Sequence, residues 1–178
     1  AGFLVVEGID FSANWGIDIG AGFLGLGLVG TFVLDNTQQD ADFLPEFDCS
    51  GLVGNTCVRP SPELVFIQTT SWTQGPVGVE LRWDFIDEVT QDALVLGGGD
   101  PNDFALNKLD AQHYFALSGS YEINDTWSVR AGIDNLLDED PPIPGNDYGG
   151  TTENSGNTFP ATYDPLGRKY WFGVKAQF

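Results

Sequence analysis

This sequence contains seven stretches in which apolar and polar residues tend to alternate. The connections between these stretches are alternately short and long. The stretches are residues 9–17, 24–34, 63–72, 77–85, 115–121, 127–133 and 168–178. Successive side chains of a β-strand point to opposite sides, so a period of two predicts strands with one apolar face. We therefore expect an all-β fold of about seven strands.

The clearest alternation lies in residues 77–85. One side of this stretch is apolar, formed by Val77, Val79, Leu81, Trp83 and Phe85. The last stretch behaves in the same way and places on one side Tyr170, Phe172, Val174, Ala176 and Phe178. In residues 24–34 the period is less clear, and residues 65–67 are apolar without alternation. All seven stretches are nevertheless predicted to be strands.

The order of the connection lengths narrows the architecture further. The connections after residues 17, 72 and 121 are short, whereas the segments 35–62 and 87–110, and a third at 137–166, are long. Soluble β-sandwiches mix loop lengths, but outer-membrane barrels have short periplasmic turns and long extracellular loops. The pattern predicts antiparallel, up-and-down transmembrane strands of a β-barrel, the last of which runs towards the periplasm.

The charge and the cysteines restrict the partners and the compartment. The net charge of −19 argues against a nucleic-acid partner, because phosphate binding needs clusters of Lys and Arg. Cys49 and Cys57 lie close together within the first long segment. This spacing indicates a disulfide-closed loop in an oxidising compartment, with two free thiols as the alternative. A disulfide there agrees with an extracellular position for the segment.

Five charged residues alternate with apolar ones on two of the predicted strands. They are Glu80, Arg82, Asp84, Arg130 and Asp134. In a barrel these side chains would face the lumen. Two interpretations remain open: the charges line a solute path, or they pair across strands to hold the wall and contact a plug.

Two further groups of residues are candidate sites. The third long segment contains acidic residues that could suit a hard cation such as calcium, namely Asp138, Glu139, Asp140, Asp147 and Glu153. No EF-hand spacing is present, so a solvated loop is the favoured interpretation, and no metal or other cofactor is expected. His113 is the only histidine, and its spacing from Ser118 and Ser120 does not define a Ser–His–acid arrangement, so no enzymatic activity is expected.

Several motifs resemble those of TonB-dependent outer-membrane receptors. Residues 130–142 look like the penultimate strand and following loop of this family, and residues 157–168 look like the segment before its terminal strand. Gly75-Pro76 followed by residues 79–85, and the earlier residues 8–12, fit the same family. The resemblance covers nearly the whole chain and is most specific towards its C-terminal end.

The resemblance implies a 22-stranded barrel with a plugged lumen. Such a receptor actively imports a scarce nutrient (a siderophore, cobalamin, a saccharide or a peptide) with energy relayed by TonB. Residues 1–178 would be its C-terminal part, in contact with lipid of the bacterial outer membrane. The plug and the remaining strands, absent from residues 1–178, would come from another chain or from residues outside this sequence. Tyr170, Phe172, Val174 and Phe178 would form the signal that the barrel-insertion machinery reads.

The alternative interpretation is a self-contained small barrel of about eight strands that serves as a porin or structural anchor, for which the length is suitable. Seven strands do not close by ordinary hairpin pairing, and an open sheet would leave two unpaired edges in lipid. A third class, a small outer-membrane hydrolase, rests only on His113. We expect the transporter, because partner strands would complete its barrel.

Overall fold

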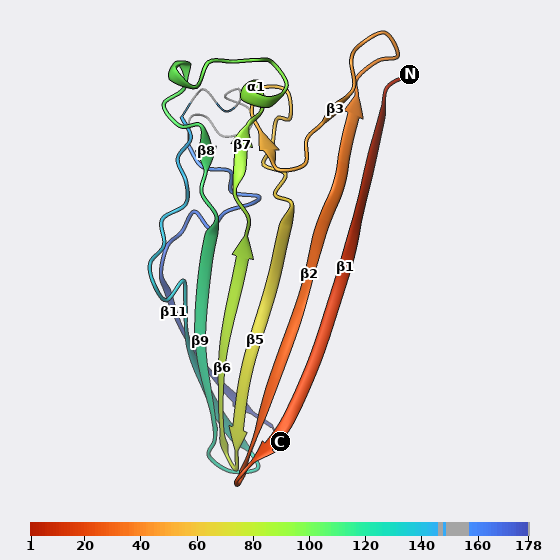
Figure 1. The fold of residues 1–178 in the computed structure, drawn as a ribbon. Coiled ribbons are helices and arrows are strands. Elements are labelled where there is room, and N and C mark those ends of the chain that lie inside the picture. The colour runs from red at the N-terminus through yellow and green to blue at the C-terminus, as the bar shows by residue number, and fades with distance from the viewer. Residues whose placement is uncertain (146–147, 149–156, 178) are drawn as a thin grey trace.

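Seven long antiparallel strands form one curved sheet (Figure 1). The computed structural model describes residues 1–145, 148 and 157–177. The strands, in their order across the sheet, are β1 (Phe3–Ile19), β2 (Gly22–Gln39), β5 (Leu64–Gln74), β6 (Val77–Ile86), β9 (Gln112–Glu122), β10 (Trp127–Asp134) and β11 (Lys169–Ala176). Each strand pairs with its neighbours in sequence among these seven, so the expected up-and-down arrangement is confirmed.

The first hairpin is longer than the sequence period indicates. β1 begins at Phe3 and β2 continues to Gln39, and the two strands pair from Phe3–Gln39 to Ile19–Gly22. One bulge interrupts the register between Glu7 and Gly8. Residues 3–6 are apolar without a break, so the alternation that marks the rest of β1 does not extend to them. Pairing with β2 therefore sets the beginning of this strand.

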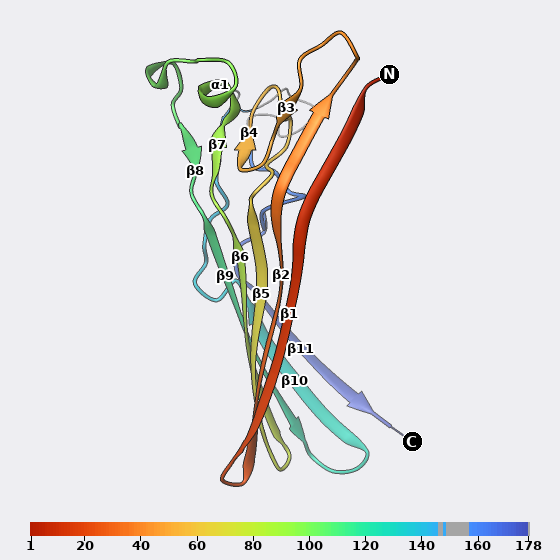
Figure 2. The same cartoon turned by 45° about the vertical axis from the view of Figure 1, so that its right-hand side comes forward.

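The short and long connections lie at opposite ends of the sheet. Figures 1 and 2 show the three short turns at the bottom and the three long connections at the top. Gly75, in the turn between β5 and β6, has a φ of 54°, a left-handed conformation that favours glycine. β11 follows a long connection and runs towards the turn end, which is the direction predicted from the sequence.

The strand register sorts the side chains of the sheet into two faces, because residues paired across neighbouring strands point to the same side. One row of paired residues is largely apolar and consists of Trp15, Leu26, Thr70, Leu81, Leu117, Ile133 and Tyr170. The adjacent row faces the other way and consists of Gly16, Gly25, Ser71, Glu80, Ser118, Gly132 and Trp171. We call these sides the apolar face and the polar face.

The apolar face is uncovered, and the buried core lies elsewhere. Tyr170 and Phe172 on β11 are 71% and 70% exposed. The described core cluster instead lies beyond the ends of the strands and comprises Val53, Val89, Leu109, Tyr148, Phe159 and Tyr163. These residues come from all three long connections, which therefore fold together into a cap with its own interior.

Short elements that the sequence analysis did not predict build this cap. A three-stranded sheet joins two of the connections, with β4 (Leu52–Val53) parallel to β7 (Val89–Gln91) and β7 antiparallel to β8 (Lys108–Leu109). β3 (Phe47–Asp48) extends the main sheet by pairing with β2. Strands of two or three residues give too few side chains for a period, so only the contact between connections reveals them.

The described helical elements are short and belong to the cap. α1 (Asp92–Val95) follows β7 directly, and the 3-10 helix η1 (Pro101–Asp103) begins after Asp100, whose side chain accepts a hydrogen bond from the Asn102 amide. None of the described helices has the length and apolarity needed to cross a membrane.

Candidate solute-facing wall and cap

The five charged residues singled out in the sequence all lie on the polar face. On β6, Arg82 donates two hydrogen bonds to Asp84 Oδ2, from Nη2 at 2.5 Å and from Nε at 3.1 Å. These two residues are neighbours along one strand, so this pair does not connect strands as the wall interpretation expected. The charge of Arg82 is thus largely occupied by Asp84.

The five residues are divided between two hollows of the polar face. Glu80 and Arg130 line a hollow of about 380 Å³ together with Trp171. The other three residues, Arg82, Asp84 and Asp134, line a second hollow of about 310 Å³ nearer the cap. The structure therefore gathers these charges into two neighbouring polar sites on one wall.

Trp171 is the one large apolar residue that the last strand places on the polar face. It pairs with Gly132 of β10, and a Cβ atom on Gly132 would lie only 2.4 Å from the indole. The ring therefore lies flat over the glycine and closes one side of the hollow that contains Arg130. Glycine is required at residue 132 by this close approach.

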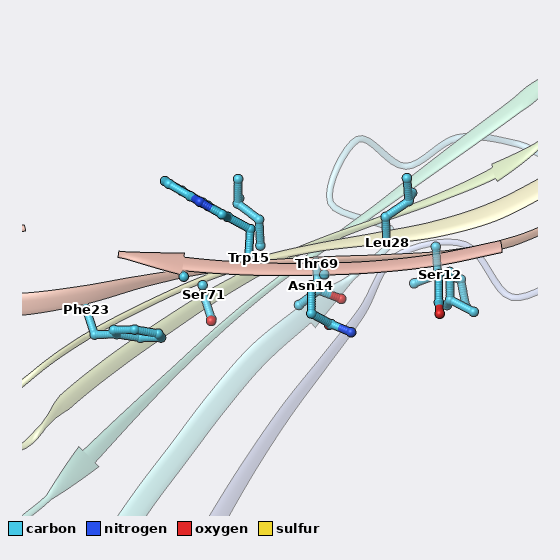
Figure 3. Close-up of a pocket in the computed structure, with 13 residues that line it drawn as sticks. Ser12, Asn14, Trp15, Phe23, Leu28, Thr69 and Ser71 are labelled. Atoms are coloured by element: carbon cyan, nitrogen blue, oxygen red, sulfur yellow. The ribbon is translucent and has the colours of Figure 1, made fainter. Parts of the chain in front are cut away.

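A third hollow, of about 610 Å³, lies against β1, β2 and β5. Asn14, Ser71 and Phe23 point to one side of the sheet there, whereas Trp15 and Leu28 point to the other (Figure 3). Glycines occupy several polar-face positions of this wall, Gly16, Gly25 and Gly27. The absence of side chains at these positions makes the polar face concave.

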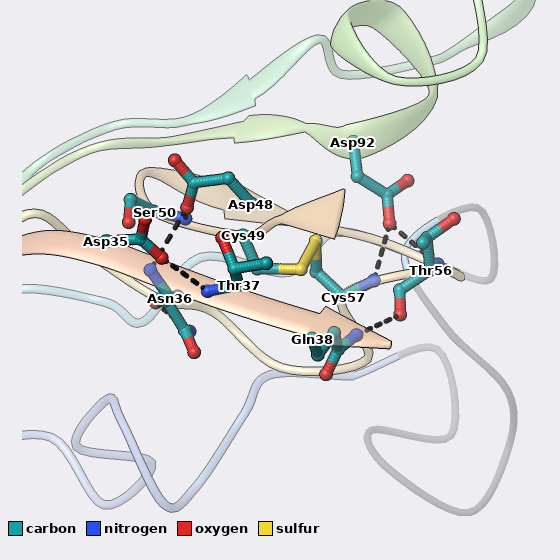
Figure 4. The surroundings of a disulfide bond; sticks show 11 residues. Asp35, Asn36, Thr37, Gln38, Asp48, Cys49, Ser50, Thr56, Cys57 and Asp92 are labelled. Atoms are coloured by element: carbon teal, nitrogen blue, oxygen red, sulfur yellow. Dashed lines mark hydrogen bonds between the residues drawn. A yellow bond between two sulfur atoms is a disulfide. The ribbon is translucent and has the colours of Figure 1, made fainter. Parts of the chain in front are cut away.

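The disulfide predicted in the first long connection is present in the cap. Cys49 and Cys57 are bonded, with their Cα atoms 5.6 Å apart (Figure 4). The buried carboxylate of Asp92, from the second connection, accepts hydrogen bonds from the amides of Thr56 and Cys57 at 2.7 and 2.8 Å. The disulfide loop is therefore tied to α1 as well as closed on itself.

Asp48 and Tyr163 are among the groups of the cap that have displaced pKa values. Partial burial of Asp48 would raise the pKa of its carboxyl, but hydrogen bonds from the Ser50 and Asn36 amides outweigh burial and hold that pKa below its usual value. Burial raises the pKa of the Tyr163 hydroxyl. Asp48 is thus held as a carboxylate and Tyr163 as a neutral phenol.

His113 lies on the apolar face, among aromatic rings. Its Nδ1 accepts a hydrogen bond from Trp83 Nε1 at 3.2 Å, and its ring stacks on Trp83 and contacts Phe85. Ser118 and Ser120 pair with residues of the polar face. His113 and these serines therefore point to opposite sides of the sheet and do not form a Ser–His pair.

Among the acidic residues singled out in the third connection, Asp138 contacts the protein itself through its carboxylate. Asp138 Oδ1 accepts a hydrogen bond from the Arg168 amide at 2.9 Å, which links the two ends of that connection. Asp147 and Glu153 lie outside the described residues. Within residues 1–145, 148 and 157–177, no group of three or more His, Cys, Asp or Glu side chains is placed to hold a metal ion.

Comparison with solved structures identifies the fold. The chain is similar to a doubly substituted mutant of the ferric enterobactin receptor of Pseudomonas aeruginosa, with a TM-score of 0.59 and 17% identity over 98% of this chain and 22% of that one. It is similar to another mutant of that receptor in complex with enterobactin, with a TM-score of 0.57 and 18% identity over 98% and 23%. No protein-family model and no curated protein matches the sequence.

The chain has the fold of a TonB-dependent receptor barrel. It spans less than a quarter of the length of the receptors it matches, so it corresponds to a barrel portion, and its sheet is not closed. At this level of identity the likeness concerns the fold. In a receptor barrel of this kind the polar face is the lumen side and the apolar face is the lipid side.

Three residues of the expected insertion signal lie on β11, the last described strand. Tyr170, Phe172 and Val174 lie on the apolar face, paired with Ile133, Ala131 and Val129. Phe178, the fourth residue of that signal, lies outside the described residues. The outward position of the three described side chains agrees with the sequence prediction, while recognition by the insertion machinery stays a prediction.

Sequence reasoning missed an aliphatic part of the lumen side. Val29, Val65, Ile67 and Ile86 lie on the polar face beneath the cap. One signal was present, because residues 65–67 are apolar without alternation, as expected for a strand that is apolar on both sides. The sequence could not show that Val29 and Ile86 lie next to them.

Proposed function

We propose that this chain forms part of the wall and the extracellular cap of a TonB-dependent transporter that imports a scarce nutrient across the bacterial outer membrane. The observation that carries the proposal is the seven-stranded up-and-down sheet, which is similar to a receptor barrel over 98% of the chain. The matched receptor binds ferric enterobactin by name, which makes a siderophore one candidate substrate beside cobalamin, saccharides and peptides.

In this proposal the two faces of the sheet and the cap have different roles. The apolar face contacts lipid, the polar face forms the lumen wall, and the cap meets the medium, where a disulfide is stable. The five lumen-side charges contact solute or a plug. In this proposal the chain is not an enzyme, and gating and the contact with TonB belong to a plug.

The open sheet argues for the transporter over a self-contained small barrel. Among the described strands, β1 and β11 each pair on one side only and do not pair with each other. Unpaired backbone groups at two edges are unfavourable in hydrocarbon, so further strands must cover them. A larger barrel supplies those strands.

The intact mass of the detergent-extracted protein, measured under native and then denaturing conditions, tests the proposal. We expect these strands in a folded species much larger than 19.3 kDa that also contains a plug-like domain. Uptake that stops when TonB is deleted would extend the result to transport. A folded species of 19.3 kDa that forms pores by itself would overturn the transporter and leave the small barrel.

A further inference from the structure

Four aliphatic side chains form a patch on the lumen side of the wall, at a place where the neighbouring residues are polar. The register arranges them in two adjacent rows, Asp10–Thr31–Val65–Ile86 and Ser12–Val29–Ile67–Asp84. We call Val29, Val65, Ile67 and Ile86 the aliphatic patch. One carboxylate stands at each end of it, from Asp10 on β1 and Asp84 on β6.

The aliphatic patch lines a hollow that can receive a small molecule. The hollow measures about 420 Å³ and is bordered by both carboxylate residues as well as by the patch. Val29 is 54% exposed and Ile67 is 41% exposed. Because exposed aliphatic surface on a wet wall is unfavourable, an apolar group that covers it gains free energy in proportion to the area buried.

Of the two carboxylates, the one of Asp10 is available as an acceptor for a bound solute. Thr31 Oγ1 donates to Asp10 Oδ1 at 2.6 Å, and no cation pairs with Asp10 in the part of the chain that the structure describes. At Asp84, Oδ2 is engaged by Arg82, whereas Oδ1 is shielded from solvent and has no described hydrogen-bond partner. The hollow therefore offers a carboxylate at its Asp10 end, whereas at the other end Asp84 is paired with Arg82 and closed to solvent.

The surroundings of the patch add to this negative potential. Ile86 packs against the core cluster of the cap, so the patch lies directly beneath it. Most of the 26 acidic residues of the chain belong to the connections that build the cap. Acidic walls around an entrance raise the local concentration of cations and repel anions.

We propose that the aliphatic patch with Asp10 binds solutes that combine an apolar body with an ammonium group. The apolar body covers Val29, Val65 and Ile67, and the ammonium group donates hydrogen bonds to the carboxylate of Asp10. This inference rests on the proposed function, since it names the chemistry of a solute that passes this wall. An anionic solute of the same size is disfavoured at this site.

Two fluorescent probes that share a dansyl group and an alkyl chain test the proposal. Dansylcadaverine ends in an ammonium group, and dansyl-aminohexanoate ends in a carboxylate. Each is titrated against the receptor polypeptide that contains this chain, held in lipid nanodiscs, with empty nanodiscs as the baseline. We expect a blue-shifted emission with dansylcadaverine and weaker binding of the carboxylate probe.

Asp10→Asn and Asp18→Asn form a matched pair of variants. Both residues lie on the polar face of β1, but Asp18 pairs with Phe23 near the turn, away from the patch. Loss of one ion pair is expected to weaken dansylcadaverine binding about fivefold in Asp10→Asn and not in Asp18→Asn. Ile67→Thr, which removes apolar contact without changing charge, is expected to weaken both probes.

Each outcome decides the proposal. Equal binding of the two probes, or equal loss in the two Asp→Asn variants, overturns the ammonium site. If neither probe shows a blue shift with the wild-type protein, the aliphatic patch is not a solute site, and a plug segment is its occupant. If Asp10→Asn does not fold, the difference between the two probes on the wild-type protein still decides the ammonium site, and Ile67→Thr decides the patch. TonB-dependent uptake measured in parallel separates failure of this inference from failure of the proposed function.

Discussion

The wall and the cap differ in where their apolar side chains go. In the wall, most aromatic and aliphatic residues of β1, β2, β5, β6, β9, β10 and β11 lie on the apolar face, and many of them are exposed. In the cap, Val53, Val89, Leu109 and their neighbours are buried against one another. The surroundings on the two sides of the sheet therefore determine where the side chains of the wall lie. The cap instead packs its apolar side chains into an interior, as a small soluble domain does.

This difference predicts that the two regions respond separately to substitution. A change inside the cap should loosen the three connections and leave the strands paired. A change on the apolar face should affect the insertion and stability of the wall and leave the cap core in place. Each region can therefore serve as an internal control for substitutions in the other.

The largest effect is expected from Phe159→Ala in the core of the cap. Phe159 is 3% exposed, and truncation of a buried aromatic residue costs about 3–5 kcal/mol. Limited proteolysis should cut the connections, while the heat-dependent mobility of the barrel on SDS gels stays as in the wild type. Loss of the folded barrel band in this variant would show that the cap and the wall are one cooperative unit.

Leu81→Arg tests the wall. Leu81 lies in the middle of β6 on the apolar face, where a charge in lipid costs about 2–4 kcal/mol near the bilayer centre. Ser118→Arg is the matched control, because Ser118 pairs with Glu80 on the polar face. Urea titration of folding into lipid vesicles should show lower stability for Leu81→Arg alone. Equal stability of the two variants would contradict the assignment of the faces.

A smaller effect is expected when the disulfide is removed by Cys49→Ser with Cys57→Ser. In the chain-entropy model, closing a loop of this length stabilises the folded state by about 2–3 kcal/mol, and this stabilisation applies to the cap. Thermal unfolding of the cap, followed by protease sensitivity, should occur at lower temperature. Reduction of the disulfide in the wild-type protein should lower the unfolding temperature of the cap in the same way. An equally large change in the stability of the barrel would show that the disulfide does not act on the cap alone.

The smallest effect concerns the Asp48 carboxylate. Its pKa is lower in the folded cap than in the unfolded chain, so its contribution is complete above the unfolded pKa of about 3.9 and is lost as the pH falls through the folded pKa. Hydrogen exchange at the Asn36 and Ser50 amides, corrected for the intrinsic rate, should become faster over that range. Asp48→Asn should remove this pH dependence, and its persistence in the variant would assign it to another group.

The sequence predicted the wall because alternation is a local property. Val77 to Phe85 shows which residues share a face without knowledge of any partner strand, and the short and long connections fix the direction of β11. The same reasoning put Arg82, Asp84 and Asp134 on one polar face, where the structure places them. It did not anticipate that Arg82 bonds to Asp84 along its own strand.

The cap and the aliphatic patch could not be read from the sequence, because both depend on contacts between distant segments. Val53, Val89 and Tyr163 come from three different connections, and none of these has a period that marks burial. Val29 and Ile86 become neighbours of Val65 and Ile67 only through the register of three strands.

The sequence alone thus determined the number of long strands, their two faces and the end at which the long connections gather, since each follows from side-chain order along one strand. Tertiary structure decided which connections share a core, which charges share a hollow, and where Asp10 and Asp84 stand relative to the aliphatic patch. The physical reason is that pairing between strands and packing between connections bring together residues that no local pattern relates.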